Sequence, residues 1–354
     1  MMIEKIRSKI DRIDEGILKL LNERVKLAIE IGKIKSQKKE DIFAPVREKE
    51  VVSNLVKRNK GPLPDECLSD IFQEIVNVSR SIQKKLKVSY FGPEATFTHL
   101  AAIKTFGKYV DYIPVESIKD VFTEIEKGRA DYGVVPIENS TEGVVNHTLD
   151  MFVDSDLKIT SEIFLEISHY LLSNETSIQK IKKVYSHPQA IAQTRNWIEK
   201  NLKDIKVVEV ASTSVAARLA KKEKGTAAIS SVVASEIYGL NILAKNIEDY
   251  KNNFTRFLVI GRQNPPSSGH DKTSIMFSVK DRVGVLHDTL VPFKKYGLNL
   301  TKIESRPTKK KAWEYIFFVD FVGHIDAQNV KKALSELEKS CSVLKVLGSY
   351  PVGE

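Results

Sequence analysis

The chain has 354 residues, of which 42% are hydrophobic; this is enough for two or three domains with packed cores and excludes a disordered chain. Cys67 and Cys341 lie far apart without a partner motif, so we expect no disulfide framework, no metal site and no cofactor. The net charge of +9 suits a nucleic acid or a small dianionic substrate, and we expect the substrate.

The first residues, Met1 to Lys5, lack the apolar stretch of a signal peptide, and no run reaches the roughly 18 uncharged apolar residues of a membrane span. We therefore expect a cytoplasmic protein that does not bind a membrane.

Residues 3 to 34 carry apolar side chains at alternating spacings of three and four, which predicts one helix about 50 Å long. This apolar seam consists of Ile3, Ile6, Ile10, Ile13, Ile17, Leu20, Leu27, Ile31 and Ile34. Shorter helices are predicted over residues 47–59 and 66–86. Because helices of such unequal length cannot bury the long seam within one chain, we expect a homodimer or a tetramer.

Arg24 interrupts the seam. A guanidinium cannot lose its proton, so it must meet an anion or incur several kcal/mol of desolvation. The anion is either a substrate or, in a register-fixing salt bridge, Glu23 or the Glu48 of a partner helix.

Residues 1–86 resemble the all-helical chorismate mutases, whose motifs are an Arg, Glu-Arg, Gly-Lys-x-Lys, Arg-Glu and Ser-x-x-x-Gln. The matching residues are Arg7, Glu23-Arg24, Gly32-Lys33-Ile34-Lys35, Arg47-Glu48, and Ser79 with Gln83. One departure is Ala44, where many relatives carry an acid.

This resemblance implies that Arg7 of one protomer, with Arg24 and Arg47 of the other, binds the two carboxylates of chorismate. It further implies that Lys35 and Gln83 contact the ether oxygen, that Glu48 binds the ring hydroxyl and that Ser79 belongs to the substrate site. The rearrangement to prephenate needs no nucleophile, only a compact conformer and stabilisation of the charge that develops on the oxygen.

From residue 87 to 260, short β runs alternate with amphipathic helices, which predicts an α/β domain. Strands are predicted over residues 132–135, 183–185, 206–210, 227–229 and 256–260, and helices over 117–127 and 190–199. Asn139, Ser140 and Thr141 follow the first of these strands, and a helix expected at about 144–151 offers N–H groups to an anion. Alternatively, Ser140 or Thr141 is an ordinary N-cap.

The segment resembles prephenate dehydratase through four landmarks: Phe91 to Thr98, Glu138 to Gly143, Ser186-His187-Pro188-Gln189, and Asn253-Phe254-Thr255-Arg256-Phe257. Glu94-Ala95 departs from the glycine that is usual there. The resemblance implies a periplasmic-binding-protein-like domain whose two lobes close over prephenate, with the Thr255 hydroxyl as proton donor and Arg256 and Asn139 near the carboxylates. The other substrate-binding residues implied are Thr96, Ser140, Thr141, Ser186, Gln189 and Phe257. On pattern alone, Phe257 is also a core residue and His187 a turn histidine.

Residues 262–271 are rich in Pro, Ser and Gly and predict a linker. Strands at 273–279, 298–306, 313–321 and 342–346, with helices at 286–296 and 327–339, give the ferredoxin-like order βαββαβ. This part resembles an ACT regulatory domain through Arg282 to His287 and Asn299 to Pro307, although Val285 adds bulk where relatives carry alanine. The resemblance implies that L-phenylalanine binds between paired domains at Gly284, Val285, Leu286, Asn299, Leu300, Glu304, Ser305 and Arg306. Alternatively, residues 304–307 are a strand end with a surface ion pair.

The sequence thus predicts a multidomain chain: an all-α chorismate mutase domain (1–86), an α/β dehydratase domain (87–264) and an α+β ACT domain (272–350). The expected function is conversion of chorismate to prephenate and then phenylpyruvate, with inhibition by phenylalanine. Two alternatives are a transcription regulator with a helical DNA-binding region and a non-catalytic amino-acid-binding protein. A long helix without a helix-turn-helix disfavours the first.

Overall fold

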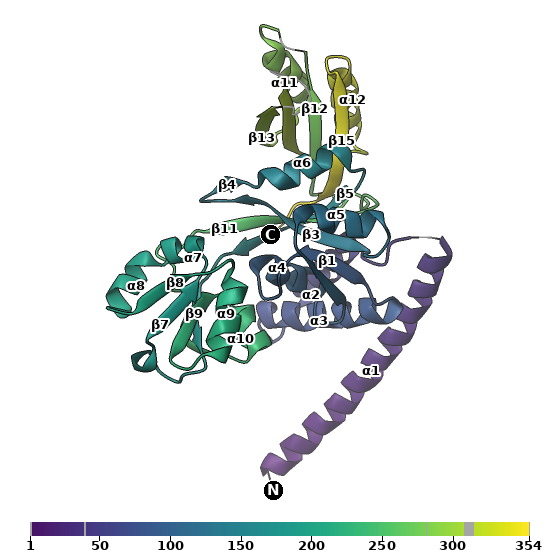
Figure 1. Cartoon of the computed structure of the whole chain (residues 1–354). Helices are drawn as coiled ribbons and strands as arrows, with labels where there is room; N and C mark the ends of the chain where they lie inside the picture. The colour runs from purple at the N-terminus through teal and green to yellow at the C-terminus, as the bar shows by residue number, and fades with distance from the viewer. Residues whose placement is uncertain (1, 39, 281, 308–314, 354) are drawn as a thin grey trace. The chain divides into compact units, whose positions relative to one another are not determined.

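The computed structural model describes residues 2–38, 40–280, 282–307 and 315–353 (Figure 1). The chain forms two compact units: Met1–Leu86 with Phe106–Asp111, and Lys87–Thr105 with Tyr112–Glu354. Within the described residues, no helix is both long and apolar enough to cross a bilayer.

The first unit contains the three predicted helices: α1 (Met2–Lys38), α2 (Pro45–Arg58) and α3 (Asp65–Gln83). Helices α1 and α2 both pack against α3. On the face of α1 that packs against α3 there is no room for a side chain at Gly32, because a Cβ there would lie 2.9 Å from the Gln83 side chain. The apolar seam lies on other faces of α1, and each of its nine residues is at least 49% exposed.

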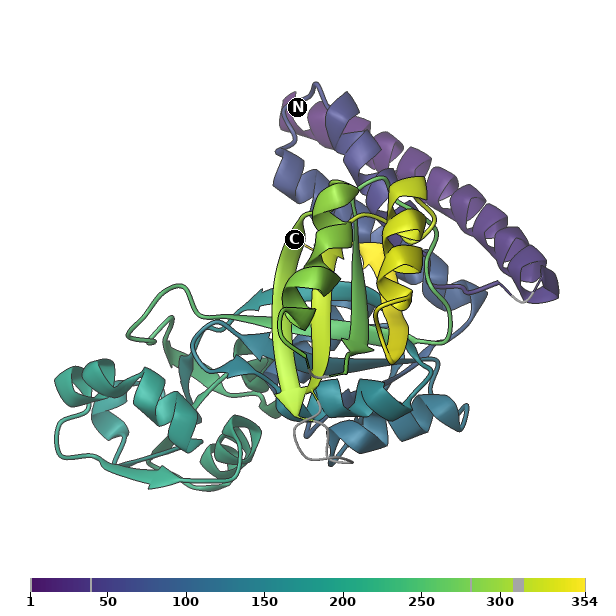
Figure 2. The same ribbon diagram turned by 90° about the horizontal axis from the view of Figure 1, so that it is seen from above.

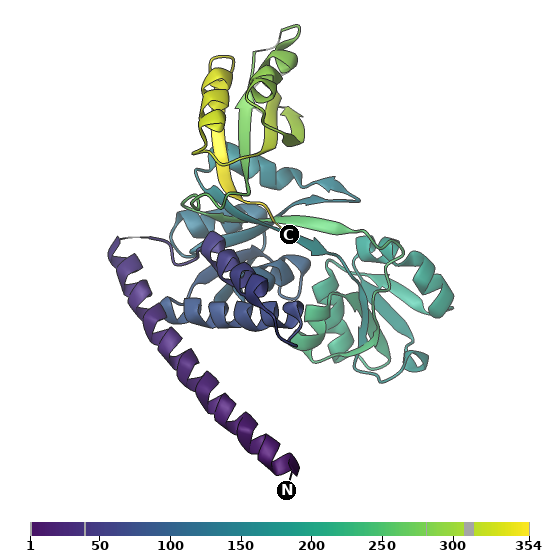
Figure 3. The ribbon, with the colours of Figure 1, turned by 180° about the vertical axis from the view of Figure 1, so that it is seen from behind.

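The second unit contains two lobes, each built on a sheet (Figure 3). The first sheet has the order β2-β1-β3-β11-β5, with β4 paired to β3. Its strands are β1 (Lys87–Phe91), β2 (Asp111–Val115), β3 (Tyr132–Asn139), β4 (Gly143–Val144), β5 (Lys158–Glu166) and β11 (Phe254–Gly261). Its helices are α4 (Phe97–Phe106), α5 (Ile118–Glu126) and α6 (Asn146–Asp154).

The second sheet has the order β10-β6-β9-β7-β8. Its strands are β6 (Tyr170–Ser173), β7 (Lys183–Ser186), β8 (Lys206–Glu209), β9 (Thr226–Ser230) and β10 (Asn241–Ala244). Its helices are the short η1 (Ile178–Lys180), α7 (Pro188–Gln193), α8 (Arg195–Asn201), α9 (Thr213–Lys222) and α10 (Val232–Tyr238). The chain passes between the lobes after β5 and before β11, and the Ile167 N–H donates to the Asn253 carbonyl between these two crossings (2.8 Å).

Two predictions about the central segment are wrong. The helix expected over 190–199 is broken at Thr194, whose hydroxyl donates to the Ala190 carbonyl, while the Asp249 carboxylate accepts from the first N–H groups of α8. The strand expected to end at Val135 continues to Asn139, and the next helix begins only at Asn146. Ser140 and Thr141 therefore lie in the connection to β4 and cap no helix.

The carboxy-terminal part has the predicted βαββαβ order: β12 (Asp271–Ser278), α11 (Val285–Lys295), β13 (Leu300–Pro307), β14 (Tyr315–Val322), α12 (Gln328–Glu338) and β15 (Val343–Pro351). The start of the strand predicted at 313–321 lies outside the described residues. Helices α11 and α12 pack together over one face of a sheet of order β13-β14-β12-β15 (Figure 2). Strand β15 also packs on β5, where a Cβ at Gly348 would collide with the Ile159 backbone.

His99 makes the stability of the second unit depend on pH. Its buried ring stacks on Tyr90 with centroids 4.6 Å apart, and its Nδ1 accepts from the Ala95 N–H (3.2 Å). Burial lowers the pKa of His99 to about 4, below the value of about 6.5 in an unfolded chain. The unfolded state therefore takes up the proton first, and the contribution present above pH 6.5 is lost as the pH falls.

We expect the free energy of unfolding to drop by about 2 kcal/mol between pH 7.5 and pH 5 through this group. Denaturant unfolding of the parent and of His99→Gln at both pH values measures it, because the variant lacks the titrating ring. Identical losses in the two proteins would show that His99 is not the cause.

Candidate active sites

A cleft of about 780 Å³ lies between the two lobes of the second unit. Five of the residues expected to bind prephenate line it: Thr96, Asn139, Gln189, Thr255 and Phe257. Asn139 and Thr255 sit at the ends of neighbouring antiparallel strands, β3 and β11, and are directly opposite in register. Phe257 is both a cleft residue and buried, so the core and site interpretations of this residue are compatible.

The side-chain amide of Asn139 is fully occupied and orients Thr255. Its Nδ2 donates to the Thr255 Oγ1 and to the Asn253 Oδ1, both at 2.8 Å. Its Oδ1 accepts from the N–H groups of Thr141 and Glu142 and from the Thr141 hydroxyl. Because the Thr255 oxygen accepts a hydrogen bond, and no acceptor among the described residues takes its proton, the hydroxyl can donate into the cleft.

Arg256 does not line the cleft, contrary to the expectation that it lies near a substrate carboxylate. Side chains alternate along a strand, so Thr255 and Phe257 share one face of β11 and Arg256 points to the other. There its guanidinium donates to Glu162 (2.7 Å), Asp320 (2.6 Å) and the Tyr350 hydroxyl (3.0 Å).

Three further residues expected in the substrate site form hydrogen bonds within the protein and do not line the cleft. The Ser140 hydroxyl donates to the Asn252 carbonyl and accepts from the Phe254 N–H, which ties the β3–β4 connection to the start of β11. Ser186 is fully buried and donates to the Ile229 carbonyl (2.8 Å). Thr141 contacts Asn139. None of the three is among the described residues that line the cleft.

No Lys or Arg occurs among the described residues that line the cleft, and its charged side chains are Glu116 and Glu142. The groups that this cleft offers to an anion are therefore backbone N–H groups and neutral donors. The first residues of α4 and α9 line the cleft, and the first N–H groups of a helix lack intrahelical acceptors. The sequence instead predicts an anion site at the start of a helix near residue 144.

Three histidines, His147, His169 and His187, also line the cleft. The His187 ring accepts from the Gln189 N–H at the start of α7, as expected of a turn histidine. The His169 Nε2 contacts the Gln193 Oε1 (2.8 Å), and burial lowers its pKa, so this imidazole is neutral near pH 7. Sequence reasoning missed His169, which lies where the chain crosses between the lobes.

In the helical unit, Arg24 turns toward α3. Its Nη1 donates to the Ser79 hydroxyl, and burial lowers its pKa without removing its charge. The Gln83 Nε2 donates to the Ser79 carbonyl (3.3 Å), while its Oε1 is buried without a partner among the described residues. Lys35 donates to the carbonyls of Asp41 and Ile42, and burial likewise lowers its pKa.

Glu48 contacts a residue that the sequence interpretation missed. Its carboxylate pairs at 2.5 Å with Arg80, which is only 2% exposed and also donates to the Phe106 carbonyl. Arg7 and Arg47 are exposed on α1 and α2, and Arg47 pairs with Glu50 at 3.3 Å. One chain therefore brings together Arg24, Ser79 and Gln83 but not Arg7 and Arg47.

The residues expected to bind an effector lie at the α11 start and along β13. Gly284 has a φ of +77°, a conformation that favours glycine, and precedes α11. Arg306 pairs with Asp150 of α6 (3.0 Å), so the ion pair expected at this strand end is present. The Asn299 carbonyl accepts from the Val322 N–H, and the side chains of Val285 and Leu300 pack on the ACT core. Ser305 is exposed, Leu286 is 37% exposed and Glu304 is half-buried.

Comparisons with known families match three consecutive segments: chorismate mutase type II over residues 6–84, prephenate dehydratase over 88–265 and the ACT domain over 273–339. These matches define an enzyme with two catalytic domains, an isomerase and a carbon–oxygen lyase, followed by an ACT domain.

The chain is 53% identical over 353 residues to the bifunctional chorismate mutase/prephenate dehydratase of Aquifex aeolicus, covering 99% of this chain and 98% of that protein. GqqA, a solved structure described as a novel type of quorum quenching acylase, matches with a TM-score of 0.70 and 27% identity over 75% of this chain and 97% of its own. The prephenate dehydratase of Arthrobacter aurescens in complex with L-Phe matches with a TM-score of 0.69 and 31% identity, covering 75% and 90%.

The chain belongs to the bifunctional chorismate mutase/prephenate dehydratases. This assignment does not favour a transcription regulator or a non-catalytic binding protein.

Proposed function

We propose that the cleft converts prephenate to phenylpyruvate and that the Thr255 hydroxyl protonates the leaving ring hydroxyl. As that proton is transferred, the ring C–O bond and the bond to the ring carboxylate break, water and carbon dioxide leave and the ring becomes aromatic; the Thr255 oxygen then regains a proton from solvent. The observation that carries the proposal is the hydrogen bond from the Asn139 Nδ2 to the Thr255 Oγ1, which leaves the Thr255 proton as the available donor. Thr255 donates as the C–O bond breaks, because a free threonine is too weak an acid near pH 7.

The substrate carboxylates bind at the helix starts that line the cleft. Thr96, Phe97 and Thr98 at α4 belong to one lobe, and Ser212 and Thr213 at α9 belong to the other. Carboxylates at these positions favour closure of the lobes, since each helix start attracts an anion. Gln189 and the neutral His169 add polar contacts.

The helical segment rearranges chorismate to prephenate in a homodimer. Arg24, Lys35, Glu48, Ser79 and Gln83 form most of the site in one protomer. Arg47 of that protomer exchanges Glu50 for a substrate carboxylate, and Arg7 of the partner subunit completes the site. The exposed seam of α1 supports this assembly, because nine large apolar residues need a covering surface. When chorismate binds, Glu48 exchanges its contact with Arg80 for the ring hydroxyl.

Three features stay predictions from the sequence. They are the domain boundaries at 1–86, 87–264 and 272–350, the choice between dimer and tetramer, and the cytoplasmic location.

The ACT domain binds L-phenylalanine and inhibits the dehydratase. Its support is the ACT fold itself and the relative from Arthrobacter aurescens that is complexed with L-Phe. Inhibition requires that phenylalanine prefer one arrangement of the second unit over another.

One assay tests this function: purified protein receives chorismate, and loss of chorismate absorbance and appearance of phenylpyruvate are followed with and without L-phenylalanine. We expect both reactions, with only the second inhibited. Glu304→Gln should need at least about tenfold more phenylalanine for half-inhibition, because it loses a carboxylate at the proposed effector site. Glu338→Gln, on the exposed face of α12, is the matched control. Unchanged inhibition in Glu304→Gln would place the effector elsewhere.

A further inference from the structure

Asn139 and Thr255 face each other across two neighbouring strands, and the residues next to them in the chain, Glu138 and Arg256, face each other as well. On β3 and β11, Asn139 is opposite Thr255, and the next register pair is Glu138 opposite Arg256. Because side chains alternate, the first pair faces the cleft and the second faces away from it.

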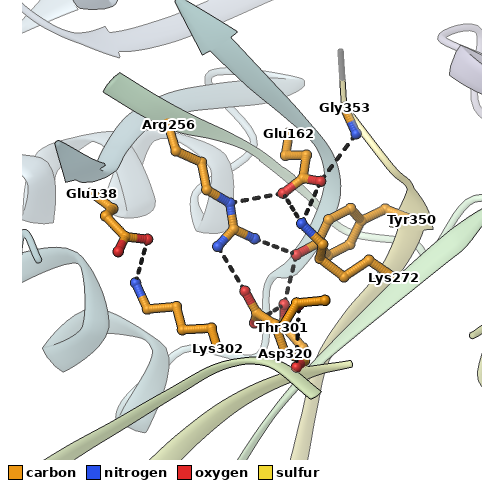
Figure 4. Close-up of polar contacts among 10 residues, drawn as sticks. Glu138, Glu162, Arg256, Lys272, Thr301, Lys302, Asp320, Tyr350 and Gly353 are labelled. Atoms are coloured by element: carbon orange, nitrogen blue, oxygen red, sulfur yellow. Dashed lines mark hydrogen bonds and ion pairs between the residues drawn. The ribbon is translucent and has the colours of Figure 1, made fainter. Parts of the chain in front are cut away.

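The second pair contacts the ACT sheet at two places (Figure 4). Arg256 donates to Asp320 of β14 and to the Tyr350 hydroxyl of β15. Glu138 accepts from Lys302 of β13 at 2.7 Å. Three ACT strands therefore hold the two residues that adjoin Asn139 and Thr255 in the chain.

The Arg256 contacts form a closed, charge-balanced network. Glu162 of β5 accepts from Arg256 and, at 2.8 Å, from Lys272 of β12. The Ser274 hydroxyl contacts both Asp320 and Tyr350. The two cations and two carboxylates are each no more than 11% exposed, so these contacts are little screened by solvent.

A buried network of this kind restrains the backbone of β11 strongly, because displacing Arg256 would leave buried charges unpaired. The restraint acts next to the point where the β3–β11 register shifts, between Arg256 and Phe257. A register shift of this kind can turn a side chain toward a site. The direction of the side chain then depends on the strand keeping its position.

We propose that Arg256 and Glu138 are positioning residues through which the ACT sheet holds Thr255 and Asn139 in catalytic geometry. The inference rests on the proposed role of Thr255. It assigns Arg256 to the regulatory interface rather than to a substrate carboxylate, and it makes dehydratase turnover depend on ACT side chains that do not line the cleft.

The test uses the full chain and substitutions in the ACT domain: Asp320→Asn, Tyr350→Phe and Lys302→Met. Tyr350→Phe removes a single hydroxyl and is the variant best tolerated by the fold. The matched control is Asp156→Asn, which removes another contact between dehydratase and ACT residues, the 3.6 Å pair with Lys345 at a fully exposed position. Steady-state kinetics with prephenate, mutase activity and thermal melting are measured for each protein.

We expect kcat of the dehydratase to fall about tenfold in Asp320→Asn and at least threefold in Tyr350→Phe and Lys302→Met, with KM within twofold of the parent. A small displacement of a catalytic group is enough for such losses. Mutase activity and the control variant should match the parent. Arg256→Lys should lower kcat similarly, and Arg256→Lys combined with Asp320→Asn should be no worse than either alone, since both break one network.

Two results would overturn the proposal. If the ACT variants melt at lower temperature yet keep the parental kcat at a temperature where they are folded, the network serves stability alone. If Arg256→Lys raises KM tenfold with kcat unchanged, Arg256 binds substrate. Failure of the parent to consume prephenate, measured in the same assay, would instead contradict the proposed function.

Discussion

Thr255→Ala is expected to lower dehydratase turnover by at least about a thousandfold, because it removes the one hydroxyl that Asn139 orients into the cleft. Thr255→Ser should keep much of the activity, since it keeps the hydroxyl. Phenylpyruvate formation from added prephenate measures the effect.

Two controls accompany this experiment. Mutase turnover in the same variant should be unchanged, as the helical unit is a separate compact unit. Thr123→Ala removes a threonine hydroxyl that donates to the Lys119 carbonyl of its own helix, and should be neutral. Equal activity of Thr255→Ala and the parent would exclude the hydroxyl from the mechanism.

Arg24→Gln is expected to lower mutase turnover by about a hundredfold to a few thousandfold. Arg24 is half-buried, and bound chorismate would desolvate the pair that it forms with a carboxylate. Loss of one partner of such a pair costs roughly 3–5 kcal/mol, and each 1.4 kcal/mol is a factor of ten. The position stays polar and can still contact Ser79, so the fold should be preserved. Loss of chorismate absorbance is the measurement.

Arg12→Gln is the matched control, because Arg12 lies on the exposed surface of the same helix. Dehydratase turnover of added prephenate should be parental in both variants. An unaffected mutase in Arg24→Gln would mean that Arg24 only fixes helix register.

The contrast between Thr255 and Arg256 shows what a motif leaves open. The run Asn253 to Phe257 identified the strand and its hydroxyl, and β11 indeed places Thr255 in the cleft. The same motif suggested that Arg256 binds substrate, yet adjacent residues on a strand face opposite ways. The face of β11 that carries Arg256 contacts the ACT sheet, whose Asp320 lies 64 residues further along the chain.

Arg80 was missed for a similar reason. In α3 the apolar residues Leu68, Ile71, Ile75, Val78 and Ile82 recur at helical spacing, and Arg80 lies between them. Its partners are Glu48 on another helix and the Phe106 carbonyl, which comes 26 residues later. A one-dimensional pattern cannot show that a charged residue off the stripe is buried, because its burial comes from segments distant in sequence.

Patterns within the sequence were sufficient to identify most of the elements, and the resemblance of its motifs to known families indicated the reaction type. Apolar spacing of three and four specified the long helix, alternating β and α runs specified the lobes, and the βαββαβ order specified the last domain. Tertiary packing decided which polar side chains reach the cleft, that helix starts and no Lys or Arg line it among the described residues, and that Arg256 contacts the ACT sheet. These features depend on the facing of strands and on long-range ion pairs, which no stretch of neighbouring residues encodes by itself.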